Sequence, residues 1–181
     1  MHKDGQKDGI SRRDVLKISV SAGLTLAAGA GFSEALAAVG ARPTAQRPEA
    51  AKAHFLKSNN CSQAILESYA PSFGITPEMA GKLATGFAGG MAAGHQCGAV
   101  TAAYMVLGLA YGPKERKVFG KMEEFNREFK ARHRELGCSQ LLGIDMSTRE
   151  GIKQAKRKGY FTTRCPEYVK TAGELLEKML A

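Results

Sequence analysis

The chain has 181 residues, of which 44% are hydrophobic and 24% charged, a composition that suits one globular domain together with a processing segment. Its formal net charge is +9 at pH 7. Such a charge can attract nucleic acid, an anionic membrane surface or an acidic protein. No recognisable nucleic-acid-binding motif is present, so the simplest interpretation is a solvated basic surface.

The first 37 residues resemble a twin-arginine (Tat) export signal. The segment 11–17 reads S-R-R-D-V-L-K, a weakly apolar run follows over 18–31, and residues 35–37 form an A-L-A cleavage site. The apolar run is too short and too polar for a membrane anchor. We therefore expect residues 1–37 to be removed and the mature protein to be exported, already folded, to the periplasm or another extracytoplasmic compartment.

The predicted mature protein carries 21 basic and 13 acidic residues, a net charge of +8. Residues 38–48 contain two prolines and little apolar content, which is typical of a linker, and residues 49–181 form the predicted domain. Many Tat substrates are exported folded because a cofactor must be inserted first. The signal therefore favours a cofactor in this small domain.

Hydrophobic spacing and capping residues predict an all-α fold of six or seven helices, because no segment alternates with the period of a strand. Thr76-Pro77 is typical of a helix start, and the apolar stripe of 114–136 is the clearest amphipathic pattern. The predicted helices are 49–57, 61–69, 76–85, 98–111, 114–136, 147–158 and one opened by Cys165-Pro166. A short turn at 138–143 separates two of them.

The organising element is the segment 98–111, fourteen residues without a charge. A helix that is apolar all round is a buried one, and fourteen residues are too few to span a bilayer. We expect a compact bundle around this central helix. A glycine-rich run over 86–94 precedes it and leads to Cys97, and those glycines permit positive φ or close approach of the backbone to another group.

Four cysteines are the candidate functional residues: Cys61, Cys97, Cys138 and Cys165. There is no C-x-x-C or C-x-x-C-H pattern, which excludes zinc-ribbon, thioredoxin and c-type haem signatures. Each cysteine is predicted at the start of a helix or turn, where unpaired N–H groups and the helix dipole favour the thiolate. Four converging helix starts would suit an anionic centre such as a [2Fe–2S] cluster.

Three alternatives stay open from the spacing alone. The cysteines could ligate an iron–sulfur cluster, form two disulfides, or lie buried as inert thiols. Zinc also accepts four cysteines, although no pair here is close in sequence. His95 lies two residues before Cys97 and is a candidate alternative ligand or hydrogen-bond donor, with a solvent-facing loop histidine as the simpler interpretation.

Five motifs together resemble the C-GCAxxG-C-C family, whose members are described as redox-active. The motifs are N-C-S-Q-A (60–64), T-G-F-A-G-G-M-A-A-G-H-Q-C-G-A-V-T-A-A (85–103), V-L-G-L-A-Y-G (106–112), G-C-S-Q-L-L-G (137–143) and C-P-E-Y-V (165–169). A similar domain occurs in split-Soret cytochrome c, where cysteines bind a binuclear iron–sulfur cluster. The resemblance implies that Cys61, Cys97, Cys138 and Cys165 are the cluster ligands. The chain differs from relatives in having Ala102 where glycine is common, and it lacks a haem-attachment motif, so no haem is expected.

The function predicted on this basis is electron transfer by an exported iron–sulfur protein, an electron carrier more than a substrate-converting enzyme. No catalytic residues are predicted, and the glycine run lacks the Lys-Ser/Thr of a P-loop. The basic surface would dock an acidic redox partner, and a homodimer is plausible. The alternatives are a metal-free thiol–disulfide redox protein and a binding module stapled by disulfides.

Overall fold

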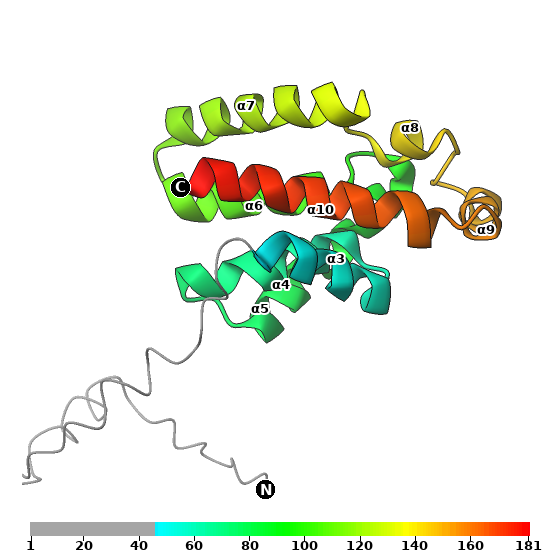
Figure 1. Ribbon diagram of the computed structural model, residues 1–181, viewed down its shortest axis with the longest axis horizontal. Helices are drawn as coiled ribbons and strands as arrows, with labels where there is room; N and C mark the ends of the chain where they lie inside the picture. The colour runs from blue at the N-terminus through cyan, green and yellow to red at the C-terminus, as the bar shows by residue number, and fades with distance from the viewer. Residues whose placement is uncertain (1–45) are drawn as a thin grey trace, which may run out of the picture. The chain divides into compact units, whose positions relative to one another are not determined.

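The structure is a computed structural model that describes residues 46–181 (Figure 1). The predicted signal peptide (1–37) and nearly all of the predicted linker (38–48) lie outside the described residues. They remain predictions.

The described residues form eight α-helices with no strand, only an isolated backbone bridge between Gln96 and Gly137. The all-α prediction is confirmed, with α8 added where a turn was expected. The helices are α3 (Arg47–Ser58), α4 (Cys61–Tyr69), α5 (Pro77–Ala84), α6 (Gly98–Tyr111), α7 (Glu115–His133), α8 (Cys138–Leu142), α9 (Arg149–Arg157) and α10 (Tyr160–Leu180). Short 3₁₀ turns occupy Ala70–Phe73 and Thr85–Phe87.

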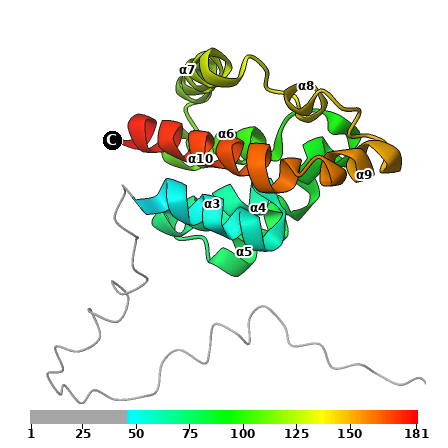
Figure 2. The same cartoon turned by 45° about the vertical axis from the view of Figure 1, so that its right-hand side comes forward.

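The helices lie in three layers. Figures 1 and 2 show α3, α4 and α5 together on one side, α6 and α10 in the middle, and α7 on the other side. The tightest packing is between α3 and α10 and between α4 and α6, and α7 packs against both α6 and α10. The short helices α8 and α9 lie at one end of the bundle (Figure 1).

The central helix α6 has the predicted bounds, Gly98–Tyr111. Val100, Val106 and Leu107 are fully buried against its neighbours. One stripe of the helix stays open, because α4, α7 and α10 cover only part of its circumference: Leu109 is 37% exposed. The expectation of burial on every side is therefore correct for most of the helix but not for this stripe.

Local signals explain most helix boundaries. The Thr76 side chain accepts a hydrogen bond from the N–H of Met79, and Pro77 takes the first helical position of α5, as predicted. Along α7 the predicted apolar stripe buries Phe125 and Phe129. No described helix has both the length and the apolar character needed to cross a lipid bilayer.

The prediction that Cys165-Pro166 opens the last helix is wrong. Helix α10 begins at Tyr160, after Gly159 in the left-handed region, and Pro166 is its seventh residue. A proline there removes one backbone hydrogen bond, to the carbonyl of Thr162 in the exposed first turn. The side chains of Thr162 and Thr163 donate to the carbonyl of Gly159, which stabilises the earlier start.

Candidate functional site

All four predicted cysteines line one cavity of about 40 Å³. Cys61 is the first residue of α4, Cys97 directly precedes α6, Cys138 is the first residue of α8, and Cys165 lies in the second turn of α10. All four are free thiols. Cys97 and Cys138 are buried, and the other two are half-buried. Residues far apart in the sequence thus meet at the end of the bundle that carries α8.

The rest of the cavity wall is almost entirely apolar. Besides the cysteines it is lined by Phe55, Asn59, Gly89, Leu141, Leu142, Met146, Phe161 and Tyr168. No carboxylate or histidine contributes to the wall. Within residues 46–181, no three or more His, Cys, Asp or Glu side chains stand close enough together to hold one metal ion.

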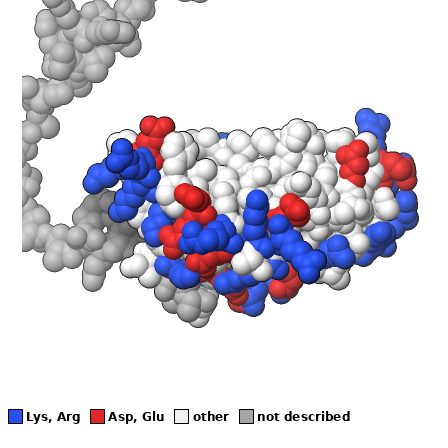
Figure 3. Space-filling model, turned by 90° about the horizontal axis from the view of Figure 1, so that it is seen from above, with Lys and Arg blue, Asp and Glu red and all other residues white. Residues whose placement is uncertain are grey.

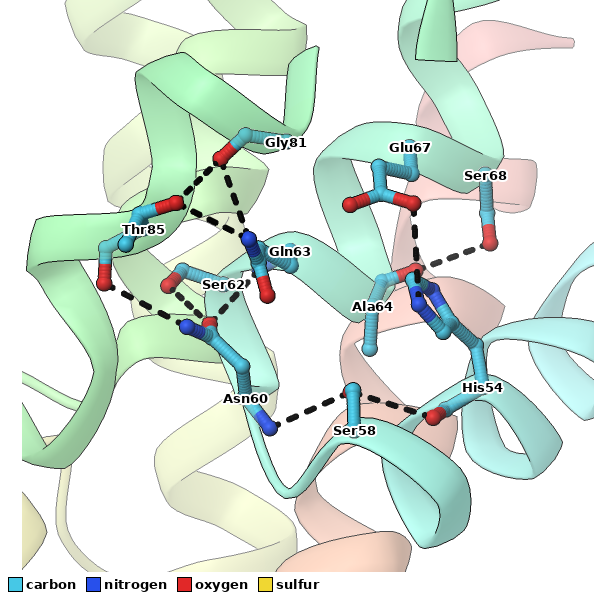
Figure 4. Close-up of polar contacts among 10 residues, drawn as sticks. All are labelled: His54, Ser58, Asn60, Ser62, Gln63, Ala64, Glu67, Ser68, Gly81 and Thr85. Carbon is cyan, nitrogen blue, oxygen red and sulfur yellow. Dashed lines mark hydrogen bonds and ion pairs between the residues drawn. The ribbon is translucent and has the colours of Figure 1, made fainter. Parts of the chain in front are cut away.

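The residues around Cys61 fix the first turn of α4 (Figure 4). Asn60 is the N-cap, and its side-chain oxygen accepts from the N–H of Gln63 at 3.0 Å and from the Ser62 hydroxyl at 2.8 Å. Its amide nitrogen donates to the carbonyl of Thr85 at 3.3 Å. Asparagine is among the preferred N-caps because it satisfies N–H groups that the helix leaves unpaired.

Ser62 and Gln63 extend this network to the end of α5. The buried Ser62 hydroxyl also lies 2.8 Å from the carbonyl of Ala84. The Gln63 amide donates to the Thr85 hydroxyl at 2.9 Å and to the carbonyl of Gly81 at 3.2 Å (Figure 4). The cysteine therefore begins a helix whose start is bonded to the segment that leads into the glycine run.

The glycine run places its backbone close to Cys61. A Cβ at Gly98 would lie 2.6 Å from the Cys61 sulfur and 2.8 Å from the carbonyl oxygen of Phe87, so only glycine fits there. Four consecutive residues, 89–92, have φ between 55° and 65°. Two of them, Met91 and Ala92, are not glycine, and each costs roughly 1–2 kcal/mol in this conformation. This left-handed turn brings Gly89 to the cavity wall.

Backbone pairing holds the Cys97 and Cys138 segments side by side. The N–H of Cys97 donates to the carbonyl of Leu136, and the N–H of Cys138 donates to the carbonyl of His95. This pair of bonds brackets the bridge between Gln96 and Gly137. Two buried thiols are thereby fixed next to each other on antiparallel backbone.

Cys165 comes from α10, one turn before Tyr168. The Tyr168 hydroxyl donates to the carbonyl of Leu141 at 2.9 Å, which ties α10 to α8. On its outer side the Tyr168 ring meets His133 edge-on, with ring centroids 4.9 Å apart. Cys165 is not at a helix start, in contrast to the prediction, so its position in the cavity depends on packing.

The four thiols differ in acidity. The Cys97 thiol donates to the Cys61 sulfur, which also receives the backbone N–H groups of Gly89 and Ala99; together these lower the pKa of Cys61 to about 7 in spite of its burial. The same shared proton and the burial of Cys97 raise the pKa of Cys97. Burial and the nearby Cys61 charge raise the pKa of Cys138 to about 12, and burial raises the pKa of Cys165 further.

The expectation that every helix start favours the thiolate is therefore wrong for Cys97 and Cys138, where burial contributes to a raised pKa. Hydrogen bonds to a sulfur lower the thiol pKa only where together they outweigh desolvation, and at Cys61 the bond from the Cys97 thiol contributes most, followed by backbone N–H groups. A negative charge at Cys61 also disfavours a second charge in the same cavity.

His95 is exposed and does not line the cavity. Only its backbone is engaged: its N–H donates to the carbonyl of Gly90, and its carbonyl accepts from Cys138. The structure thus does not bring the predicted alternative ligand together with the cysteines.

Several residues at the site carried no predicted role. Asn60 could have been identified by the strong preference for asparagine at helix N-caps. Phe161 and Tyr168 had no signal in the sequence, because an aromatic residue on a helix is usually part of the core. The left-handed turn at Met91 and Ala92 was equally unmarked, since neither residue type favours it.

The matching family model covers residues 59–179 and is described as "Putative redox-active protein (C_GCAxxG_C_C)". All four cysteines fall within the matched region. No curated protein and no solved structure shows significant similarity to the chain. The match spans well over half of the chain and confirms the resemblance seen in the motifs: this protein belongs to the C_GCAxxG_C_C family of redox-active proteins.

Proposed function

We propose that Cys61, Cys97, Cys138 and Cys165 hold an iron–sulfur cluster and that the protein carries electrons outside the cytoplasm. The observation that carries the proposal is the meeting of all four cysteines at one apolar cavity. Cysteine thiolates are the usual ligands of [2Fe–2S] and [4Fe–4S] clusters. The Tat-like segment 11–17 supports export after the cofactor has been inserted.

The donor atoms around the cavity are of the type that an iron–sulfur cluster requires. The donors are four sulfurs, without a competing carboxylate or imidazole in the wall. A cluster spreads its ligands over more than one iron, so the thiols need not all lie within bonding distance of a single ion. A bound cluster would supply the chemistry of accepting and releasing one electron at a time.

The chain's own residues would then control the charge and the surroundings. The N–H groups of Gly89 and Ala99 already point at the Cys61 sulfur and would stabilise negative charge there. The apolar side chains of Phe55, Leu141 and Leu142 exclude water from the cavity. Hydrogen bonds to sulfur and solvent exclusion are two of the means by which proteins set cluster potentials.

A second candidate function is metal-free thiol–disulfide exchange, favoured by the contact between Cys61 and Cys97. A thiolate with a pKa near ambient pH next to a protonated partner is the arrangement of a nucleophilic and a resolving thiol. In that mechanism Cys138 and Cys165 would have no chemical role.

Iron and acid-labile sulfide in the anaerobically purified protein test the two candidates, with single Cys→Ser variants of all four positions. The cluster proposal predicts stoichiometric iron and sulfide in the wild type and a large loss in every variant. The exposed His95→Ala serves as a control that keeps its iron. An iron-free wild type whose thiol couple is lost only in C61S and C97S would contradict the cluster and favour thiol exchange.

A further inference from the structure

A second hollow adjoins the cysteine cavity. It is a surface groove of about 470 Å³ lined by Asn59, Lys156, Gly159, Phe161 and Thr162. Asn59 and Phe161 belong to the walls of both the groove and the cysteine cavity. These two residues therefore form a wall between the groove and the cysteine cavity.

The chain around the groove is strongly basic. Residues 149–164 contain six basic residues, Arg149, Lys153, Lys156, Arg157, Lys158 and Arg164, and one acidic residue, Glu150. Glu150 lies near Arg157 at 3.4 Å and Lys153 at 3.8 Å. Among the described residues, neither Lys156 nor Lys158 has an ion-pair partner.

The charge distribution over the molecule is uneven. In Figure 3, charged side chains crowd one side and the two ends of the visible face, and a broad area between them is uncharged. The α9 end carries lysine and arginine side chains along its edge, with acidic side chains between them (Figure 3). A local excess of one sign beside a low-dielectric opening concentrates oppositely charged molecules there.

We propose that this groove is the docking surface for an acidic redox protein, and that electrons pass between that partner and the cysteine site across the wall formed by Asn59 and Phe161. The inference rests on the redox role of the cysteines given under the proposed function. Carboxylates on the partner would face Lys156 and Lys158, which steers the encounter and increases its rate. Apolar contact with Phe161 would bring the two centres to their shortest separation.

The test compares two charge-reversal variants that change the net charge by the same amount. Lys156→Glu with Lys158→Glu alters one lining residue of the groove and the residue next to Gly159, whose ammonium lies over the Tyr160 ring. Lys114→Glu with Arg116→Glu alters the exposed start of α7, at the opposite end of the bundle (Figure 1). Only a local effect of the groove can separate the two variants.

The first measurement uses protein that carries the proposed iron–sulfur cluster and has been reduced with dithionite. One electron passes from the protein to hexacyanoferrate(III), an anionic oxidant, or to hexaamminecobalt(III), a cationic one. At low ionic strength we expect the groove variant to react about tenfold more slowly with the anion, and faster with the cation. The control should change less than about twofold, and 0.5 M salt should remove the difference.

The second measurement uses reduced, metal-free protein and needs no cluster. A cavity thiolate attacks the disulfide of dianionic 5,5′-dithiobis(2-nitrobenzoate), forming a mixed disulfide and releasing one thiolate of the reagent. Neutral 2,2′-dithiodipyridine reacts in the same way without charge. We expect the ratio of the anionic to the neutral rate to fall about tenfold in the groove variant only.

The outcomes separate this inference from the proposed function. An iron-free protein that still shows the changed reagent ratio would contradict the cluster and keep the groove as the route to the thiols. Equal effects of the two variants, in either measurement, would overturn the docking surface. So would binding to vesicles of anionic phosphatidylglycerol that the groove variant loses while its reaction rates stay unchanged.

Discussion

The tripeptide Cys-Ser-Gln occurs twice in this chain, and its two copies have different chemistry. Cys61-Ser62-Gln63 and Cys138-Ser139-Gln140 both begin a helix, and both cysteines line the same cavity. Yet the pKa of Cys61 is lowered to about 7, whereas that of Cys138 is raised to about 12. Identical local sequence and a similar position in the helix therefore do not determine the pKa of the thiol.

The surroundings of the two copies explain the difference. The Cys97 thiol donates to the Cys61 sulfur, the N–H groups of Gly89 and Ala99 also reach it, and Asn60 caps the nine-residue α4. Gly137 offers no side-chain cap to the five-residue α8, and burial governs Cys138. The hydrogen bond from the Cys97 thiol and those from distant backbone N–H groups, and not the tripeptide, thus separate a thiol with a lowered pKa from one with a raised pKa.

The largest expected effect is on alkylation of the reduced, metal-free protein by iodoacetamide. Because the pKa of Cys61 is lowered to about 7 and that of Cys138 is raised, far more of Cys61 than of Cys138 is thiolate at neutral pH. The rate of the fastest thiol should therefore rise with pH and level off above about pH 7, and C61S should abolish that phase. C138S should keep it, and a fast phase that persists in C61S would contradict the assignment.

Gly98→Ala should disrupt the close packing of the backbone against Cys61. The new Cβ would meet the Cys61 sulfur and the Phe87 carbonyl, and we expect a loss of about 1–3 kcal/mol in urea unfolding. Gly108→Ala, in the same helix, meets no atom within 4 Å and should instead stabilise by about 0.5–1 kcal/mol. Similar effects of the two substitutions on the free energy of unfolding would contradict the close packing of residue 98 against Cys61.

Removing the cap should make the start of α4 resemble that of α8. We expect Asn60→Ala to reduce the free energy of unfolding by about 1 kcal/mol and to raise the pH midpoint of Cys61 alkylation. Thr148→Ala removes the matching cap of α9, where Thr148 accepts from the N–H of Gly151 at 3.0 Å. It should have a similar effect on stability and none on Cys61.

Ser62 and Ser139, the serines of the two tripeptides, should differ less in their contribution to stability. Ser62→Ala removes the buried hydroxyl that lies 2.8 Å from both the Asn60 side-chain oxygen and the Ala84 carbonyl, which we expect to destabilise by about 1–3 kcal/mol. Ser139 is half-buried and accepts from the N–H of Met146 at 3.0 Å, so Ser139→Ala should destabilise by about 0.5–1.5 kcal/mol. Thermal unfolding of both variants measures the difference, and a larger loss at Ser139 would reverse the comparison.

The smallest expected effect is a pH dependence of the free energy of unfolding, caused by His133. His133 packs between Phe129 and Tyr168, and burial lowers its pKa below 6.5. Below pH 6.5 the unfolded chain binds a proton that the folded chain binds less readily, so stability should fall as pH falls through this range and stay level above it. His133→Gln should remove that slope, and an unchanged slope would assign it to another group.

Much of the fold was predictable because its signals are local. The bounds of α4 and α6 match the expected ones, and the Thr76-Pro77 start of α5 is where capping chemistry predicts it. The start of α10 could not be predicted in this way. Pro166 resembles a first helical residue, whereas the helix begins after the turn at Gly159. A five-residue helix such as α8 is too short to carry a periodic pattern.

The site was predictable in its residues but not in its electrostatics. The family motifs name all four cysteines, and the structure places them at one cavity. Their acidities depend on burial and on groups from segments remote in the sequence, such as the Cys97 thiol and the Gly89 N–H beside Cys61. No local pattern encodes these quantities.

A spectroscopic redox titration of protein purified anaerobically from cells carrying the intact chain tests the central claim most directly. If the four thiols hold an iron–sulfur cluster, visible absorption should bleach in a single step with a slope of about 59 mV per tenfold change in the ratio of oxidised to reduced protein, the value for one electron. A colourless protein whose thiols titrate with about 30 mV per tenfold change would show a two-electron dithiol couple and contradict the claim.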